Sequence, residues 1–183
     1  MTPLLRLEQV ALRRGGRLLF ERLDLALEPG DALQVTGPNG SGKSSLMRLA
    51  AGLLRQEHGR VDRSPLALAD DALALDRELP LRRALAFWGG AVAEAMERLG
   101  IDHLSDLPVR LLSSGQLKRA TLARVAASGA PLWLLDEPLN ALDSDGAERL
   151  SALVAAHRAG GGAVLAASHQ PLPGEWPGLQ LAR

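Results

Sequence analysis

The feature that most constrains the fold is the octapeptide GPNGSGKS at residues 37–44. It fits the pattern G-x-x-x-x-G-K-[S/T] in full. The run DALQVT at residues 31–36 precedes it and is long enough for a buried strand, while residues 44–54 follow with the apolar spacing of a helix. A strand, a glycine-rich loop and a helix in this order predict a phosphate-binding loop in an α/β fold.

Each part of this loop has a physical role. The glycines leave room for backbone N–H groups to face phosphate oxygens, and the start of the following helix favours an anion. We expect Lys43 to reach the β- and γ-phosphates and Ser44 to bind Mg²⁺. The predicted ATP-binding residues here are Gly37, Pro38, Asn39, Gly40, Ser41, Gly42, Lys43, Ser44 and Ser45. Alone, the loop leaves kinases, GTPases and ATPases open, and a chance glycine-rich turn is the structural alternative.

Two adjacent carboxylates end an apolar run at residues 132–138, which read LWLLDEP. Ligands bind at the carboxyl ends of strands in open α/β sheets. Asp136 is therefore a candidate Mg²⁺ ligand, and Glu137 is a candidate general base that polarises water against the γ-phosphate. Ordinary loop charges are the alternative for such a pair alone, but the phosphate loop favours the functional interpretation.

Residues 112–116 read LSSGQ, and here the chain resembles the ABC ATPases, whose signature is LSGGQ. Ser114 stands where that family usually has its first glycine. The motif opens a predicted helix, so the Ser113 hydroxyl and the Gly115 N–H could bind a γ-phosphate. A simple serine helix cap is the alternative interpretation.

The resemblance implies that the signature of one subunit faces the phosphate loop of a second, so that two ATP molecules are sandwiched. Ser113, Gly115 and Gln116 would then contact ATP. The segment NALD at residues 140–143 matches the family's D-loop along that seam, which adds Asp143 to the ATP-binding residues. His169 follows a predicted strand and matches the histidine that contacts the γ-phosphate, so the resemblance implies Glu137 and His169 as the catalytic residues.

The segments LWLLDEPLNALD and SHQPLP are similar to a narrower family, the ATP-binding subunits of haem exporters in cytochrome c maturation. That resemblance implies an ATP hydrolase with ATP and Mg²⁺ as cofactors and a second ATP-binding subunit as partner. A homodimer is expected, and the sequence leaves a mixed pair open as the alternative. It also implies integral membrane subunits and a peripheral place on the cytoplasmic face of the bacterial inner membrane. The alternatives are the ATPase of another small ABC transporter, a non-transport ABC ATPase, or a cassette that binds ATP without hydrolysing it.

The chain departs from the ABC pattern in places. The Q-loop glutamine is not evident, and Asp70 and Asp71 occupy its region. The aromatic residue that commonly stacks on adenine is also missing, and Arg13 or Arg14 takes its place, whose guanidinium plane can stack on a base. Phe87 and Trp88 could line a groove for a membrane subunit or pack in the core.

Composition narrows the function classes. Lys plus Arg and Asp plus Glu both number 21, so there is no basic excess of the kind expected of a nucleic-acid partner. The absence of cysteine excludes disulfides and thiolate metal sites. No segment approaches the ~20 apolar residues of a membrane span, and residues 1–9 do not resemble a signal peptide. Another chain must therefore supply any membrane part.

We predict an α/β fold of the ABC-type P-loop NTPases, as a single domain over residues 1–183. A mainly parallel core sheet should carry an antiparallel β subdomain, which begins with strands at residues 4–12 and 17–27, and a short helical subdomain at about 75–128. Residues 64–127 are predicted to be mostly helical. Further strands are expected at 132–135, 163–168 and 179–182, with a helix at 143–159 capped by Asp143 or Ser144.

Overall fold

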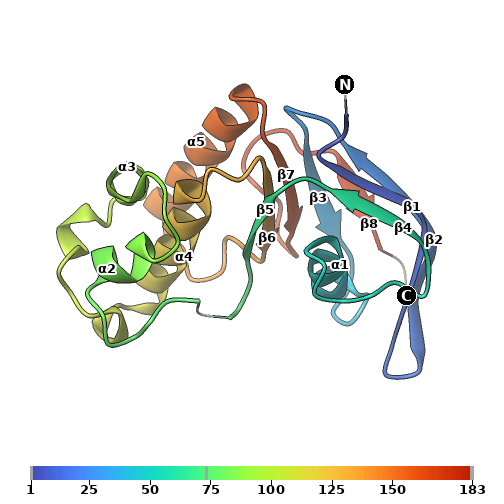
Figure 1. Cartoon of the computed structure of the whole chain (residues 1–183), viewed down its shortest axis with the longest axis horizontal. Coiled ribbons are helices and arrows are strands. Elements are labelled where there is room, and N and C mark those ends of the chain that lie inside the picture. The colour runs from blue at the N-terminus through green and yellow to red at the C-terminus, as the bar shows by residue number, and fades with distance from the viewer. Residues whose placement is uncertain (1, 73, 182–183) are drawn as a thin grey trace.

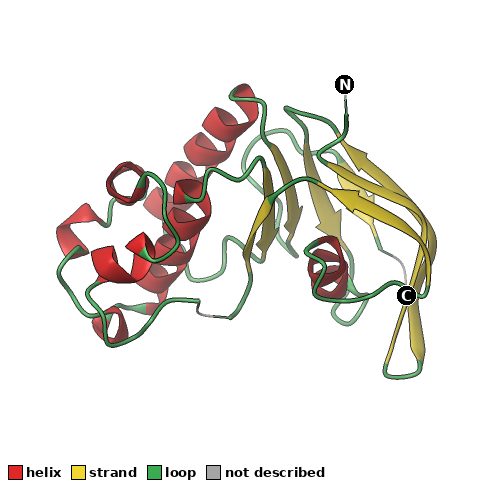
Figure 2. Cartoon of the chain, viewed as in Figure 1, coloured by secondary structure: helices red, strands yellow, loops and turns green. Residues whose placement is uncertain are grey.

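The computed structural model describes residues 2–72 and 74–181, so Ala182 at the end of the last predicted strand lies outside the described residues. Figure 1 shows strands gathered on one side of the chain and most helices on the other, and Figure 2 shows the same division by element type. The described elements form two sheets, one antiparallel and one parallel.

The antiparallel sheet has the order β2-β1-β4, and it is built from β1 (Leu5–Arg14), β2 (Arg17–Leu27) and β4 (His58–Arg63). The parallel sheet has the order β5-β6-β7-β3-β8. Its strands are β3 (Ala32–Thr36), β5 (Leu66–Ala69), β6 (Leu132–Asp136), β7 (Ala163–Ala167) and β8 (Gly178–Gln180).

The helices divide between the two faces of the parallel sheet. Helix α1 (Lys43–Ala50) lies on the side of the antiparallel sheet, and it shares an apolar core with β1, β3, β6 and β7. The opposite side carries the other helices, which are α2 (Leu81–Ala86), α3 (Val92–Arg98), α4 (Ser114–Ala127) and α5 (Ser144–Ala159), with short 3₁₀ turns at Asp102–Leu104 and Val109–Leu111. Strands β6 and β7 are buried along their whole length because both faces of the sheet are covered.

Most predicted elements are confirmed within a few residues, including the cap of α5, where the Asp143 carboxylate accepts a bond from the Gly146 N–H at 2.9 Å. Two predictions were wrong. The mostly helical interpretation of residues 64–127 fails at 66–69, which form the edge strand β5, because a four-residue apolar run has no period that separates strand from helix. The helix expected at 44–54 ends at Ala50, and Gly52 has a left-handed φ of 79° just beyond it.

No helix among the described residues has both the length and the apolar character needed to cross a lipid bilayer.

Candidate nucleotide-binding and hydrolysis site

The loop between β3 and α1 is shaped by close backbone approaches. Gly37 has φ of 144°, and a Cβ there would lie 2.6 Å from the Leu181 carbonyl oxygen and 2.8 Å from the Ser41 Oγ. Gly42 has φ of 105° and is the N-cap of α1. Side chains are therefore excluded at Gly37, and α1 starts at Lys43 with its free N–H groups facing the loop.

Lys43 bends back over this loop. Its Nζ donates to the carbonyl oxygens of Gly37 at 2.8 Å and Pro38 at 3.3 Å, and the residue is only 7% exposed. A phosphate oxygen is a stronger acceptor for an ammonium group than a neutral carbonyl. Lys43 is thus held where a bound phosphate could attract it without a large rearrangement.

One cavity of about 430 Å³ joins the loop to the acidic end of β6. Its lining comes from three parts of the chain, namely Arg14 and Leu19 of the antiparallel sheet, Asn39, Gly40 and residues 42–45 of the phosphate loop and helix start, and Glu137. The volume falls within the range of about 300–1,000 Å³ that is usual for small-molecule sites. Residues more than 90 positions apart in the sequence therefore meet at one site.

Asp136 ends β6 with its carboxylate buried, and the residue is 4% exposed. Burial raises its pKa, whereas a hydrogen bond from the Ser44 hydroxyl lowers it. Its Oδ1 has no hydrogen-bond partner within the described part of the chain. A buried carboxylate oxygen beside a serine hydroxyl is a donor set that suits a hard cation such as Mg²⁺.

Glu137 and His169 form a contact at the ends of β6 and β7. The Glu137 Oε2 lies 2.8 Å from the His169 Nδ1 and also accepts a bond from the His169 backbone N–H at 3.4 Å. Glu137 has a positive φ of 46°, which is uncommon for a residue other than glycine. The backbone thus turns at the end of β6. As a result, the Glu137 carboxylate contacts His169 and also lines the loop cavity.

Residues 113–116 form the N-terminus of α4 as a complete capping box. The Gln116 N–H donates to the Ser113 Oγ at 3.3 Å, and the Ser113 N–H donates to the Gln116 Oε1 at 2.8 Å. The helix-cap interpretation of this motif is therefore correct as a description of local structure. Ser113 remains exposed at the tip, so capping leaves its side chain accessible to a second ligand.

The helix tip is joined to the segment before α5. A Cβ on Gly115 would lie 2.8 Å from the carbonyl oxygen of Ala141, a residue with φ of 65°. Arg119, four residues further along α4, donates to the Asp143 Oδ1 at 2.5 Å and to the Asp145 Oδ2 at 2.7 Å. Bonds from the Gly146 N–H and from Arg119 lower the pKa of Asp143. The carboxylate of Asp143 is thus engaged inside the chain.

The helix tip and the phosphate loop line different cavities. Ser113, Gly115, Gln116 and Asp143 line a cavity of about 450 Å³ together with His103, and no residue lining it also lines the loop cavity. Within one chain, the structure therefore brings together Lys43, Ser44, Asp136, Glu137 and His169, but it leaves the predicted signature residues apart from them.

Comparison with known proteins decides the family. Residues 20–140 match the model of the ABC transporter family. The chain is 59% identical over 177 residues to the cytochrome c biogenesis ATP-binding export protein CcmA of Sphingopyxis alaskensis, covering 92% of this chain and 91% of that protein. The chain belongs to the ABC transporter family. CcmA of Novosphingobium aromaticivorans is 55% identical over 166 residues, covering 89% and 87% of the two chains.

Solved ABC proteins share the fold. An ABC transporter ATP-binding protein from Pyrococcus furiosus superposes with a TM-score of 0.85 at 19% identity, covering 97% of this chain and 96% of that one. The ATP-binding subunit of another ABC transporter gives a TM-score of 0.83 at 19% identity, covering 91% and 79%. The predicted ABC ATPase fold class is thereby confirmed, and the family implies that the chain binds a nucleotide.

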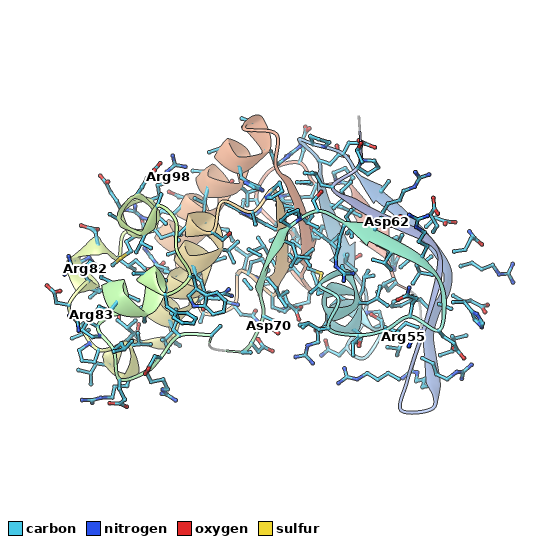
Figure 3. All side chains as sticks on the ribbon, viewed as in Figure 1. Arg55, Asp62, Asp70, Arg82, Arg83 and Arg98 are labelled. Atoms are coloured by element: carbon cyan, nitrogen blue, oxygen red, sulfur yellow. The ribbon has the colours of Figure 1, made fainter. Side chains whose placement is uncertain are left out.

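The structure also places the residues where the chain departs from the ABC pattern. Asp70 follows β5 and lies between α1 and the helices on the far side of the sheet (Figure 3), and its Oδ2 is 3.9 Å from the Nε of Arg48. Asp70 and Asp71 share a cavity of about 330 Å³ with Lys118 of α4. Burial lowers the pKa of Lys118, while Asp71 and three other carboxylates raise it. The region thus holds a charged set in place of a neutral glutamine.

Of the two arginines considered for the base, Arg14 lines the loop cavity, whereas the Arg13 Nε lies 3.4 Å from Glu57. Phe87 is 82% exposed and Trp88 is 43% exposed, so neither ring is enclosed in the core.

Arg119 was not identified from the sequence. Its partners lie 24 and 26 residues away along the chain, so only the fold brings them together. No local signal marks it, because Arg119 is the sixth residue of α4 and lies beyond the first turn, where a positive charge opposes the helix dipole.

Proposed function

We propose that this chain is the ATP-binding and ATP-hydrolysing subunit of a haem-export ABC complex in cytochrome c maturation. Its curated relatives, at 39–59% identity, carry the name cytochrome c biogenesis ATP-binding export protein. The observation that carries the hydrolase role is that the phosphate loop and Glu137 line one cavity.

ATP binds along residues 37–45, with its phosphates against the backbone N–H groups of the loop and the start of α1. Lys43 leaves the carbonyls of Gly37 and Pro38 to contact the β- and γ-phosphates. Ser44 and Asp136 hold Mg²⁺, which neutralises phosphate charge when bound. Mg²⁺ typically binds one or two protein carboxylates together with substrate phosphates. The assignment of Mg²⁺ fits this pattern, since the described residues hold no cluster of three or more acidic or histidine ligands.

Glu137 is the general base of the proposed reaction. Its carboxylate accepts a proton from the water that attacks the γ-phosphorus, while the bond between that phosphorus and the β–γ bridging oxygen breaks and ADP leaves. His169, 2.8 Å from that carboxylate, orients it and contacts the γ-phosphate. The two side chains already meet before ATP binds, so little reorganisation is needed at the moment of reaction.

A second ATP-binding subunit completes the site in a head-to-tail pair. Within one chain, the cavity at the phosphate loop and the cavity at the N-terminus of α4 share no lining residue, which supports this arrangement. Ser113, Gly115 and Gln116 of one subunit contact the γ-phosphate on the loop of the other, and Asp143 orders the D-loop at the seam. The proposal further includes homodimerisation, integral membrane subunits and a peripheral position on the cytoplasmic face of the bacterial inner membrane.

The hydrolase role is tested with Glu137→Gln, which keeps the shape of the side chain and removes the base. Phosphate release by the full chain should fall by ~10²–10⁴-fold, while equilibrium ATP binding is kept. Glu148→Gln, a change of the same kind on α5, is the matched control and should behave as the unsubstituted chain. Unchanged turnover in Glu137→Gln would refute the role of this residue.

The export role is tested by co-purification from bacterial membranes. An affinity-tagged copy of the chain should co-purify with integral membrane subunits of cytochrome c maturation. Deletion of the gene that encodes the chain should abolish c-type cytochromes. Recovery of membrane subunits of an unrelated transporter, with normal cytochrome c content in the deletion strain, would show that the cargo is different.

A further inference from the structure

A glutamine lies in the middle of the strand that leads into the phosphate loop. Gln34 is in β3, which runs between β7 and β8, and it is only 8% exposed. Its neighbours along the strand, Leu33 and Val35, are aliphatic. A buried amide destabilises a fold unless its polar atoms are hydrogen-bonded. The partners of this side chain therefore indicate what it does.

Both polar atoms of Gln34 bind the main chain just after His169. The Nε2 donates to the Gln170 carbonyl oxygen at 2.7 Å, and the Oε1 accepts from the Leu172 N–H at 3.3 Å. These partners lie 136 and 138 residues away along the chain. The amide thus connects β3 to the segment that carries the histidine.

Strand β3 also holds the residue before His169. The Ser168 N–H donates to the Val35 carbonyl oxygen at 3.2 Å, and the Ser168 Oγ accepts a bond from the Gln170 N–H at 3.1 Å. The backbone is therefore held on both sides of His169 by one strand, which continues into Gly37 of the phosphate loop. The His169 ring between these attachments reaches Glu137 at 2.8 Å.

We infer that Gln34 is a positioning residue for His169. Its two hydrogen bonds fix the position of the His169 backbone and the orientation of the ring relative to the phosphate loop. This inference rests on the catalytic role proposed for His169. The Gln34 side chain bonds neither Glu137 nor any residue that lines the loop cavity, so its effect on His169 passes through the segment at residues 168–172. The amide is used because one side chain must donate to one main-chain group and accept from another, which no apolar residue of that size can do.

The test is a double-mutant cycle between Gln34→Met and His169→Ala in the full chain, read as phosphate release. Met keeps the length of the side chain and removes both hydrogen bonds. Because small displacements of catalytic groups cost up to ~10²-fold in rate, Gln34→Met should lower kcat roughly tenfold with little change in KM for ATP. In the His169→Ala background the same substitution should have no further effect on kcat.

The control is Val164→Ala, which removes buried atoms from the neighbouring strand β7 without touching residues 168–172. It should lower the melting temperature but leave kcat unchanged, which separates positioning from general loss of stability. If Gln34→Met does not fold, Gln34→Asn keeps the amide but is one methylene too short to make both contacts, and the same cycle applies.

Three results would overturn the inference. Turnover that stays normal in Gln34→Met while His169→Ala is slow would refute it and leave the proposed function standing. An equal slowing by Gln34→Met with and without His169 would show that Gln34 acts elsewhere. Normal turnover in His169→Ala would remove the role of His169 and the inference with it.

Discussion

Gly115→Ala should separate the activity of the helix tip from its stability. The added Cβ would lie 2.8 Å from the Ala141 carbonyl oxygen, about 0.6 Å short of the 3.4 Å at which ordinary contact begins. Because the obstacle is backbone, the tip of α4 and the D-loop must move apart. Overpacking of this kind costs about 1–3 kcal/mol, and the better helix propensity of alanine offsets about 1 kcal/mol of it. The net loss of folding free energy should be about 0–2 kcal/mol.

Turnover should respond far more strongly. A shift of a fraction of an ångström at the tip displaces Ser113 and the Gly115 N–H from the partner's γ-phosphate, and such misplacement costs up to ~10²-fold in rate. We therefore expect phosphate release to fall roughly ten- to hundredfold, while ATP binding to the phosphate loop of the isolated chain is unchanged.

The assay pairs thermal unfolding with steady-state phosphate release. Gly178→Ala is the matched control, because a Cβ there meets nothing within 4 Å and the backbone needs no positive φ. It should leave both readouts unchanged. Turnover of Gly115→Ala within about twofold of the unsubstituted chain would refute the close approach of tip and D-loop as a functional constraint.

Three further predictions test other parts of the account. Gly90→Ala should lower the free energy of unfolding in urea by about 2–5 kcal/mol, because its φ is 81° and the added Cβ would lie 1.6 Å from the Ala127 carbonyl oxygen. Gly89→Ala, the control at φ of 77° in open space, should lower it by only about 1–2 kcal/mol. Equal losses would contradict the close approach of Gly90 to Ala127. Burial lowers the pKa of His157 in the folded chain, so the unfolded chain binds a proton on this imidazole more tightly. The free energy of unfolding, measured with urea, should therefore fall as the pH drops below about 6.5, and His157→Phe should flatten this dependence. The same pH dependence in His157→Phe would contradict the burial of the ring. Ser114→Gly should keep turnover within about twofold, because Ser114 lines the cavity of Asp70 and not the tip cavity; a large gain would show that the serine obstructs the signature.

The core strands could be predicted because strands buried on both faces appear in the sequence as uninterrupted apolar runs. The runs LWLLD and AVLAA are apolar nearly throughout, as strands covered on both faces must be, and each is a strand buried along its whole length. Strand β5 could not be predicted in this way, because a run of four residues is too short to distinguish the period of a strand from that of a helix. It is identified as a strand only by its pairing with β6.

The candidate site divides in the same way. The phosphate loop and the two acids at the end of β6 are contiguous in sequence, so their residue types and flanking elements identified them. Arg119 and Gln34 could not be found like this, because each gains its partners only when segments 24 to 138 residues apart fold together. The one local sign of Gln34 was a glutamine between two aliphatic residues of a strand, a pattern that a strand at an exposed edge also gives.

The central claim is that a triphosphate on one subunit's glycine loop is enclosed by the helix tip of a second. A crystal structure of the Glu137→Gln chain grown with ATP and Mg²⁺ tests it most directly. We predict two chains related head to tail, with each γ-phosphate between Lys43 of one chain and Ser113 of the other. An empty loop, or ATP bound with Lys43 still on the carbonyls of Gly37 and Pro38 and no second chain over the phosphate, would contradict the account.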